Sequence, residues 1–77
     1  MKMLVQGHES STKIKLLISL TSIRSEVTIE ALERYYVLGW TIEGLVSALS
    51  IDENNFRRAD KILNNAADIC AKINDEN

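Results

Sequence analysis

Apolar residues recur at spacings of three and four along most of the chain, which is the pattern of amphipathic helices. No proline interrupts the pattern, and the three glycines leave few positions where a turn is obligatory. Four separate segments carry the periodicity. The sequence therefore predicts an all-α fold, a small bundle of four helices.

The first predicted helix runs from about Lys13 to Ser22. It is apolar around most of its circumference, so we expect it to be buried or shared with a partner chain. Its apolar residues are Ile14, Leu16, Leu17, Ile18, Leu20 and the neighbouring Ile23.

The second predicted helix begins after Ser25, a residue suited to capping. It ends at Gly39, which suits the left-handed position that follows a helix. The expected buried stripe of this helix is Val27, Ala31, Tyr35 and Leu38.

Two further helices are predicted after Gly39. Thr41 is the expected N-cap of a short third helix, and Ser50 with Ile51 interrupts the periodicity that this helix carries. Asp52 can cap a fourth helix of about 20 residues, close to 30 Å long. The apolar positions of the third helix are Ile42, Leu45, Val46 and Leu49. Those of the fourth are Phe56, Ala59, Leu63, Ala66, Cys70 and Ile73, flanked by Ile62 and Ile69.

Length and composition predict one domain, because 77 residues with 45% apolar side chains suffice for one small core. Residues 1–11 are polar and aperiodic, so we predict a flexible N-terminal arm there and a single helical domain over residues 12–77. The longest apolar stretch is too short to span a membrane, and the single cysteine, Cys70, is compatible with a reducing compartment. We therefore expect a cytoplasmic protein.

The distribution of charge changes this picture. The formal net charge is −2, so the chain as a whole does not attract polyanions. Residues 25–53 carry six carboxylates and one arginine, whereas residues 54–61 carry three cations, Arg57, Arg58 and Lys61, and one carboxylate. At about 100° per residue these cations share one helix face with Asn54 and Asn65, opposite the buried Phe56.

A short helix, a tight turn and a second helix with a basic outer face form the layout of a helix-turn-helix, in which the second helix meets DNA. Asn54 and Asn55, at the start of that helix, are expected to approach the bases. Arg24 lies between two helices, where either a phosphate contact or a charge interaction with a helix C-terminus is plausible. The candidate DNA-binding residues are Arg24, Thr41, Asn54, Asn55, Arg57, Arg58, Lys61 and Asn65. The competing interpretation is a solvated helix face, with Glu53 and Arg57 as an ordinary i,i+4 pair.

The segment "LISLTSIRS", followed by "ALERYYVLGWT" and by a fourth helix that opens with "NNF", resembles the PapB/FocB-type regulators of bacterial fimbrial adhesin operons. The resemblance covers about residues 16–73. It implies an all-α DNA-binding protein that acts as an oligomer on AT-rich sites, with contacts in the minor groove. The geometry of the helix-turn-helix points instead to the major groove, so the groove stays open at this stage.

Catalysis is not expected, because the sequence contains no nucleophile with a base placed by a known motif and no glycine-rich phosphate loop. His8 and Cys70 do not form a familiar metal-ligand spacing, so no metal, cofactor or small-molecule substrate is expected. The remaining alternative is a non-catalytic helical interaction module, antitoxin-like or an adaptor, whose apolar first helix docks a partner. Under the regulator hypothesis we expect at least a dimer, since so small a domain buries only about 60% of its unfolded surface.

Overall fold

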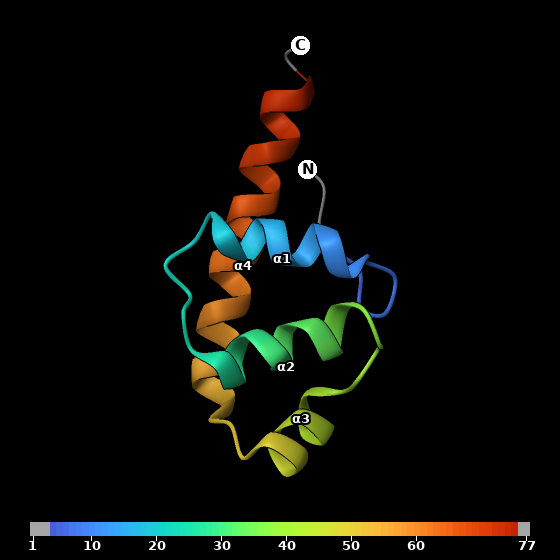
Figure 1. Cartoon of the computed structure of the whole chain (residues 1–77), viewed down its shortest axis with the longest axis vertical. Helices are drawn as coiled ribbons and strands as arrows, with labels where there is room; N and C mark the ends of the chain where they lie inside the picture. Colours follow the sequence, from blue (N-terminus) through green and yellow to red (C-terminus); the bar gives the residue numbers. More distant parts are fainter. Residues whose placement is uncertain (1–3, 76–77) are drawn as a thin grey trace.

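The computed structural model describes residues 4–75, and within this range it contains four helices and no strand. The helices are α1 (Ser11–Ser19), α2 (Glu26–Tyr36), α3 (Ile42–Leu49) and α4 (Glu53–Asp75). Figure 1 shows α1, α2 and α3 arranged along the long α4, with the C-terminal half of α4 extending past α1. The predicted all-α class and the helix-turn-helix formed by α3 and α4 are confirmed.

Side-chain caps define where the helices begin. Ser10 accepts a hydrogen bond from the backbone N–H of Lys13, and Ser25 and Thr41 do the same for α2 and α3. Asp52 accepts from the backbone N–H of Asn54 at 2.7 Å, so it caps α4 as predicted. These contacts satisfy amides that have no partner within their own helix.

The turn between α3 and α4 is tight because Ser50 adopts a left-handed conformation, with φ at 54°. Its N–H donates to the carbonyl of Val46 and closes α3. α4 then begins at Glu53, so only residues 50–52 separate the two helices. The position that holds glycine in many helix-turn-helix proteins is here a serine that takes the same backbone conformation.

The core lies where α1, α2 and α4 meet, and α3 closes one end of it (Figure 1). Phe56 stacks edge-on against Tyr35, with the ring centroids 5.5 Å apart. The largest fully buried side chains come from all four helices: Ile14, Leu32, Leu45, Phe56 and Leu63. α2 packs against each of the other helices, so it is the central element of the bundle.

The predicted buried stripe of α2 is wrong by about one position. Val27 and Leu38 are exposed and Tyr35 is only half-buried, whereas Leu32 and Tyr36 are buried together with the predicted Ala31. Both stripes have helical spacing, so the pattern alone does not choose between them. The choice depends on how α1 and α4 pack on either side of α2.

The predicted flexible arm is also wrong for residues 4–10, while residues 1–3 lie outside the described range. Leu4 is part of the buried core, and the backbone N–H groups of Gly7 and Glu9 donate to the carbonyls of Tyr35 and Tyr36 at 3.1 and 3.0 Å. Gly7 lies so close to Gly39 that a Cβ on Gly7 would come within 3.1 Å of its Cα, and both glycines have positive φ angles. This segment is therefore a packed part of the domain.

A partly buried polar cluster links α2, α4 and the N-terminal segment. The Tyr36 hydroxyl donates to the Asp60 carboxylate and accepts from Asn64 Nδ2 at 3.0 Å, and Asn64 Oδ1 accepts from the N–H of Leu4 at 3.3 Å. Burial, reinforced by the hydrogen bond to Asp60, raises the pKa of Tyr36 well above its ordinary value. The cluster fixes how these three segments meet.

Replacing Tyr36 with phenylalanine is expected to lower the free energy of unfolding by about 1–2 kcal/mol, because Asp60 and Asn64 each lose a buried partner. Urea unfolding at pH 7 measures this loss. Because the raised pKa keeps the phenol neutral in the folded state, the wild type is also expected to lose stability as the pH rises above about 10, where the unfolded chain ionises. The Tyr36 contribution to that loss should disappear in Tyr36→Phe.

Tyr35→Phe is the matched control, since the Tyr35 hydroxyl makes no hydrogen bond within residues 4–75. It should unfold close to the wild type. Equal effects of the two substitutions would mean that the cluster contributes nothing specific.

None of the helices described here is long and apolar enough to cross a membrane.

Candidate nucleic-acid interface

The outer face of α4 carries most of the predicted DNA-binding residues. The side chains on this face are exposed to solvent. They belong to Asn54, Arg57, Arg58, Lys61 and Asn65. They lie opposite Phe56 and Leu63, which anchor the other side of the helix in the core, so the core contacts hold this face in a fixed orientation.

Arg57 forms an ion pair with Glu53 one turn earlier. Its Nε and one terminal nitrogen both lie 2.9 Å from the same carboxylate oxygen. Both side chains are exposed, and such i,i+4 pairs contribute only about 0.3–0.5 kcal/mol. A phosphate group could therefore displace Glu53 at little cost.

Arg58 and Lys61 differ from Arg57 in this respect. Within residues 4–75 neither side chain makes a hydrogen bond or an ion pair. They present two positive charges one turn apart on the helix, and nothing in this part of the chain needs to be released before they bind an anion. They are the strongest candidates for phosphate contacts.

Thr41 lies near Arg57 but in a mixed electrostatic setting. Both residues line an open hollow of about 440 Å³, together with two carboxylates, Glu43 and Glu53. The Thr41 hydroxyl accepts from the N–H of Gly44 at 3.0 Å, so its described role is to cap α3. The carboxylates oppose phosphate binding here and direct a polyanion toward the second and third turns of α4.

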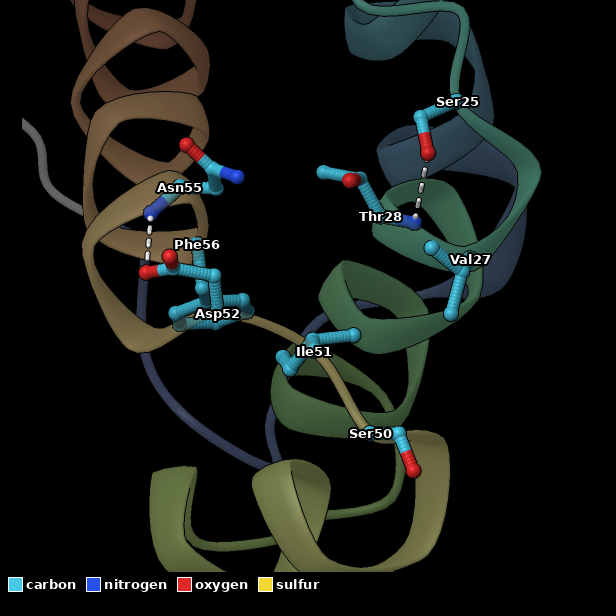
Figure 2. A pocket seen from close by; sticks show the side chains of 8 residues that line it. All are labelled: Ser25, Val27, Thr28, Ser50, Ile51, Asp52, Asn55 and Phe56. Atoms are coloured by element: carbon cyan, nitrogen blue, oxygen red, sulfur yellow. Dashed lines mark hydrogen bonds between the residues drawn. The ribbon is translucent and has the colours of Figure 1, made fainter.

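Asn55 is separated from the other predicted residues of α4. It lines a hollow of about 310 Å³ between α4 and the N-terminus of α2. Figure 2 shows its side chain directed toward Thr28 across this hollow, with Ser25 and Val27 on the same wall as Thr28 and Ile51 in the turn below. Of the two asparagines expected to approach the bases, Asn54 shares a face with the cations, whereas Asn55 lines the hollow beside α2.

Arg24 lies apart from the outer face of α4. Its guanidinium donates to the carbonyls of Thr21 and Ile23 at 2.7 and 2.8 Å, in the loop that follows α1. It also lines an apolar hollow with Lys15. Of the two alternatives from the sequence, these contacts correspond to a positive charge that holds carbonyls beyond a helix C-terminus.

Gln6 is a neighbour of the candidate interface that the sequence did not indicate. It lines the hollow of Thr41 and Arg57, and its amide donates to the carbonyls of Gly39 and Trp40 at 3.3 and 2.8 Å. Because it comes from the N-terminal segment, only the packing of that segment brings it to α3 and α4. No periodicity or motif in the sequence marks it.

The described residues contain no group of three histidine, cysteine or acidic side chains that could hold a metal ion. Cys70 is a half-buried free thiol on α4. Arg34 stacks over the ring of Trp40, 4.7 Å from its centroid, and Trp40 packs partly buried against the core. The candidate surface therefore consists of the charges and amides of α4.

Comparison with known proteins identifies the fold. The sequence matches no protein-family model and no curated protein. The structure is similar to the crystal structure of E. coli FocB, with a TM-score of 0.88 and 23% sequence identity, over 96% of this chain and 84% of that chain. The four helices, with the helix-turn-helix of α3 and α4, thus have the fold of FocB, as the sequence resemblance predicted.

Proposed function

We propose that this protein is a DNA-binding transcriptional regulator of fimbrial or adhesin operons that acts in the cytoplasm and without catalysis. The observation that carries the proposal is the pair of unengaged cations, Arg58 and Lys61, on the exposed face of the second helix of a helix-turn-helix. The FocB fold supports it, because the sequence resembles PapB/FocB-type regulators in the same elements.

DNA would meet the second and third turns of α4. Asp52, Glu53 and Glu43 surround the start of the helix and repel phosphates, whereas Arg57, Arg58 and Lys61 attract them one to two turns later. Phosphate contacts supply affinity, and Asn54 and Asn65 are the neutral side chains beside them that can read base edges. The preferred DNA under this proposal is AT-rich.

The proposal includes self-association. The outer face of α4 in a single copy presents only three cations, on a chain of net charge −2, which gives weak binding to a polyanion. Two or more copies on one duplex add their contacts, and their affinities combine through a high effective concentration.

A titration of the full chain with an AT-rich duplex at several salt concentrations tests the proposal. We expect the logarithm of the binding constant to fall linearly with the logarithm of the salt concentration, with a slope of roughly −3 for each bound copy. Fluorescence anisotropy of a labelled duplex measures the binding constant at each salt concentration, and the slope follows from these constants.

The same titration decides between the grooves. Displacement by distamycin, a minor-groove ligand, indicates the minor groove, and sensitivity to methylation of guanine N7 indicates the major groove. Salt-independent binding, or no binding at low salt, would contradict the proposal.

A second candidate function is a helical interaction module that binds no DNA. Leu16 on α1 and Leu20 just after it favour it, since these two apolar residues are 63% and 67% exposed. This alternative predicts the absence of salt-dependent DNA binding, so the same titration distinguishes the two.

A further inference from the structure

The C-terminal half of α4 extends beyond the other helices (Figure 1). Large apolar side chains on α4 remain exposed, Ile69 by 58% and Ile73 by 57%, and Ile62 is exposed to a lesser degree. Ala66, which lies between them, is half-buried. Ile62, Ala66, Ile69 and Ile73 follow one another at spacings of four, three and four residues. We call these four residues the isoleucine stripe.

Counting about 100° per residue places the isoleucine stripe between two other faces of α4. The core face, with Phe56 and Leu63, lies about a quarter turn to one side. The cationic face, with Arg58 and Lys61, lies about a quarter turn to the other side. The stripe is therefore an apolar surface that adjoins the candidate DNA interface without forming part of it.

We propose that the isoleucine stripe docks the same stripe of a second copy of this chain, with the two α4 helices antiparallel. The 4-3-4 spacing reads the same in both directions, so a two-fold axis between Ala66 and Ile69 superimposes the stripe on itself. Ile62 then faces Ile73 of the second copy, and Ala66 faces Ile69. A small residue opposite a large one packs without a void, whereas a parallel pair sets Ala66 against Ala66.

The antiparallel arrangement also determines where the cations go. A two-fold axis perpendicular to both helices keeps a given flank of the stripe on the same side of the pair. The two cationic faces then form one continuous surface, and the two cores lie on the opposite side. A parallel pair places the cationic faces on opposite sides, so the choice of orientation rests on the proposed DNA-binding function.

The dimensions of this pair suit duplex DNA. With the axis between Ala66 and Ile69, the two copies of Arg58 lie 19 residues apart along the helices, or about 30 Å at 1.5 Å per residue. One turn of B-DNA rises about 34 Å. The two groups of cations can therefore reach the same side of a duplex in successive turns.

The size of the stripe predicts a weak dimer. Ile62 to Ile73 spans about 16 Å of helix, so the contact is at the small end of specific interfaces. Leu16 on α1 and Leu20 just after it are further exposed apolar side chains, but the isoleucine stripe alone forms the proposed contact. The cations of the two copies repel one another, so DNA is expected to strengthen the association.

Sedimentation of the full chain over a range of concentrations provides the first test. We expect Ile69→Ser to raise the dimer dissociation constant by more than tenfold. The matched control is Leu38→Ser, which removes another exposed apolar side chain, 67% against 58% for Ile69, just after the end of α2. A wild type that stays monomeric up to millimolar concentration, or equal effects of the two substitutions, would overturn the proposal.

Cysteine cross-linking tests the orientation and does not depend on the folding of an interface variant. In a Cys70→Ser background, Ile62→Cys and Ile73→Cys chains are prepared separately, mixed and oxidised. The antiparallel pair predicts that the mixed disulfide between the two variants predominates. Predominance of the two homodimeric disulfides, or no cross-link above the background of a Leu38→Cys control, would overturn it.

The two proposals fail in different ways. If the mixed disulfide forms but the protein binds no DNA, the proposed interface is supported and the proposed function is contradicted. If the protein binds DNA with a steep salt dependence but no mixed disulfide forms with or without DNA, the proposed function is supported and the proposed interface is contradicted.

Discussion

Replacing Arg57, Arg58 and Lys61 together with alanine is expected to weaken DNA binding by roughly two to three orders of magnitude at moderate salt. Each phosphate contact contributes about 0.9 to the slope of log affinity against log salt concentration, so the slope should become shallower by nearly 3 per copy. Lys61→Ala alone should weaken binding about equally on all sequences and reduce the slope by roughly 1. Anisotropy titrations at four or more salt concentrations measure these slopes.

The control for the triple variant removes cations from another surface. Lys13 and Lys15 on α1 are exposed, and each forms an ion pair with a glutamate, so a Lys13→Ala, Lys15→Ala variant changes the net charge without touching α4. Its slope should stay near that of the wild type. An unchanged slope in the α4 triple variant, with its helical circular dichroism intact, would identify these cations as an ordinary solvated face.

The helices could be predicted because their determinants are local. Ser25, Thr41 and Asp52 accept hydrogen bonds from amides two or three residues later, so the sequence itself contains both partners of each cap. The end of the second helix is also determined locally, because the residue Gly39 has a φ of 80°, which glycine adopts without strain. The first helix begins at Ser11, earlier than predicted, because Ser10 provides its cap, and it ends at Ser19, also earlier than predicted.

The N-terminal segment could not be predicted, because its determinants are distant in the sequence. Gly7 and Glu9 bond to carbonyls at the end of α2, and Leu4 bonds to Asn64 on α4. Glu9 also pairs with Lys13, whose hydrogen bond lowers the pKa of that carboxyl. None of these contacts imposes a period on the sequence, so the segment resembled an arm.

In the candidate interface, too, the features that lie on a single helix could be predicted and those that depend on packing between helices could not. The shared face of Arg57, Arg58 and Lys61 follows from helix geometry alone, once the fourth helix is known. The position of Asn55 beside α2 and that of Arg24 over the loop carbonyls depend on how separate helices pack. Sequence reasoning grouped all of them because it had no means of placing one helix against another.

Phe56→Ala is expected to destabilise the protein by about 3–5 kcal/mol, the usual loss when a fully buried phenylalanine is truncated. Phe56 is 2% exposed, and it joins the first turn of α4 to Tyr35 of α2. A domain of this size has about 5–10 kcal/mol of stability in total, so much of the variant should be unfolded near 37 °C. Urea or thermal unfolding followed by circular dichroism measures the loss.

Leu38→Ala is the control for this prediction, because it shortens an exposed apolar side chain and should cost less than about 1 kcal/mol. A loss below 1 kcal/mol in Phe56→Ala would contradict the position of Phe56 in the core. The variant also separates stability from recognition, since it keeps Arg57, Arg58 and Lys61. At low temperature its folded fraction should bind DNA with the wild-type salt slope, and only the apparent affinity should fall, in proportion to the fraction of chains that are folded.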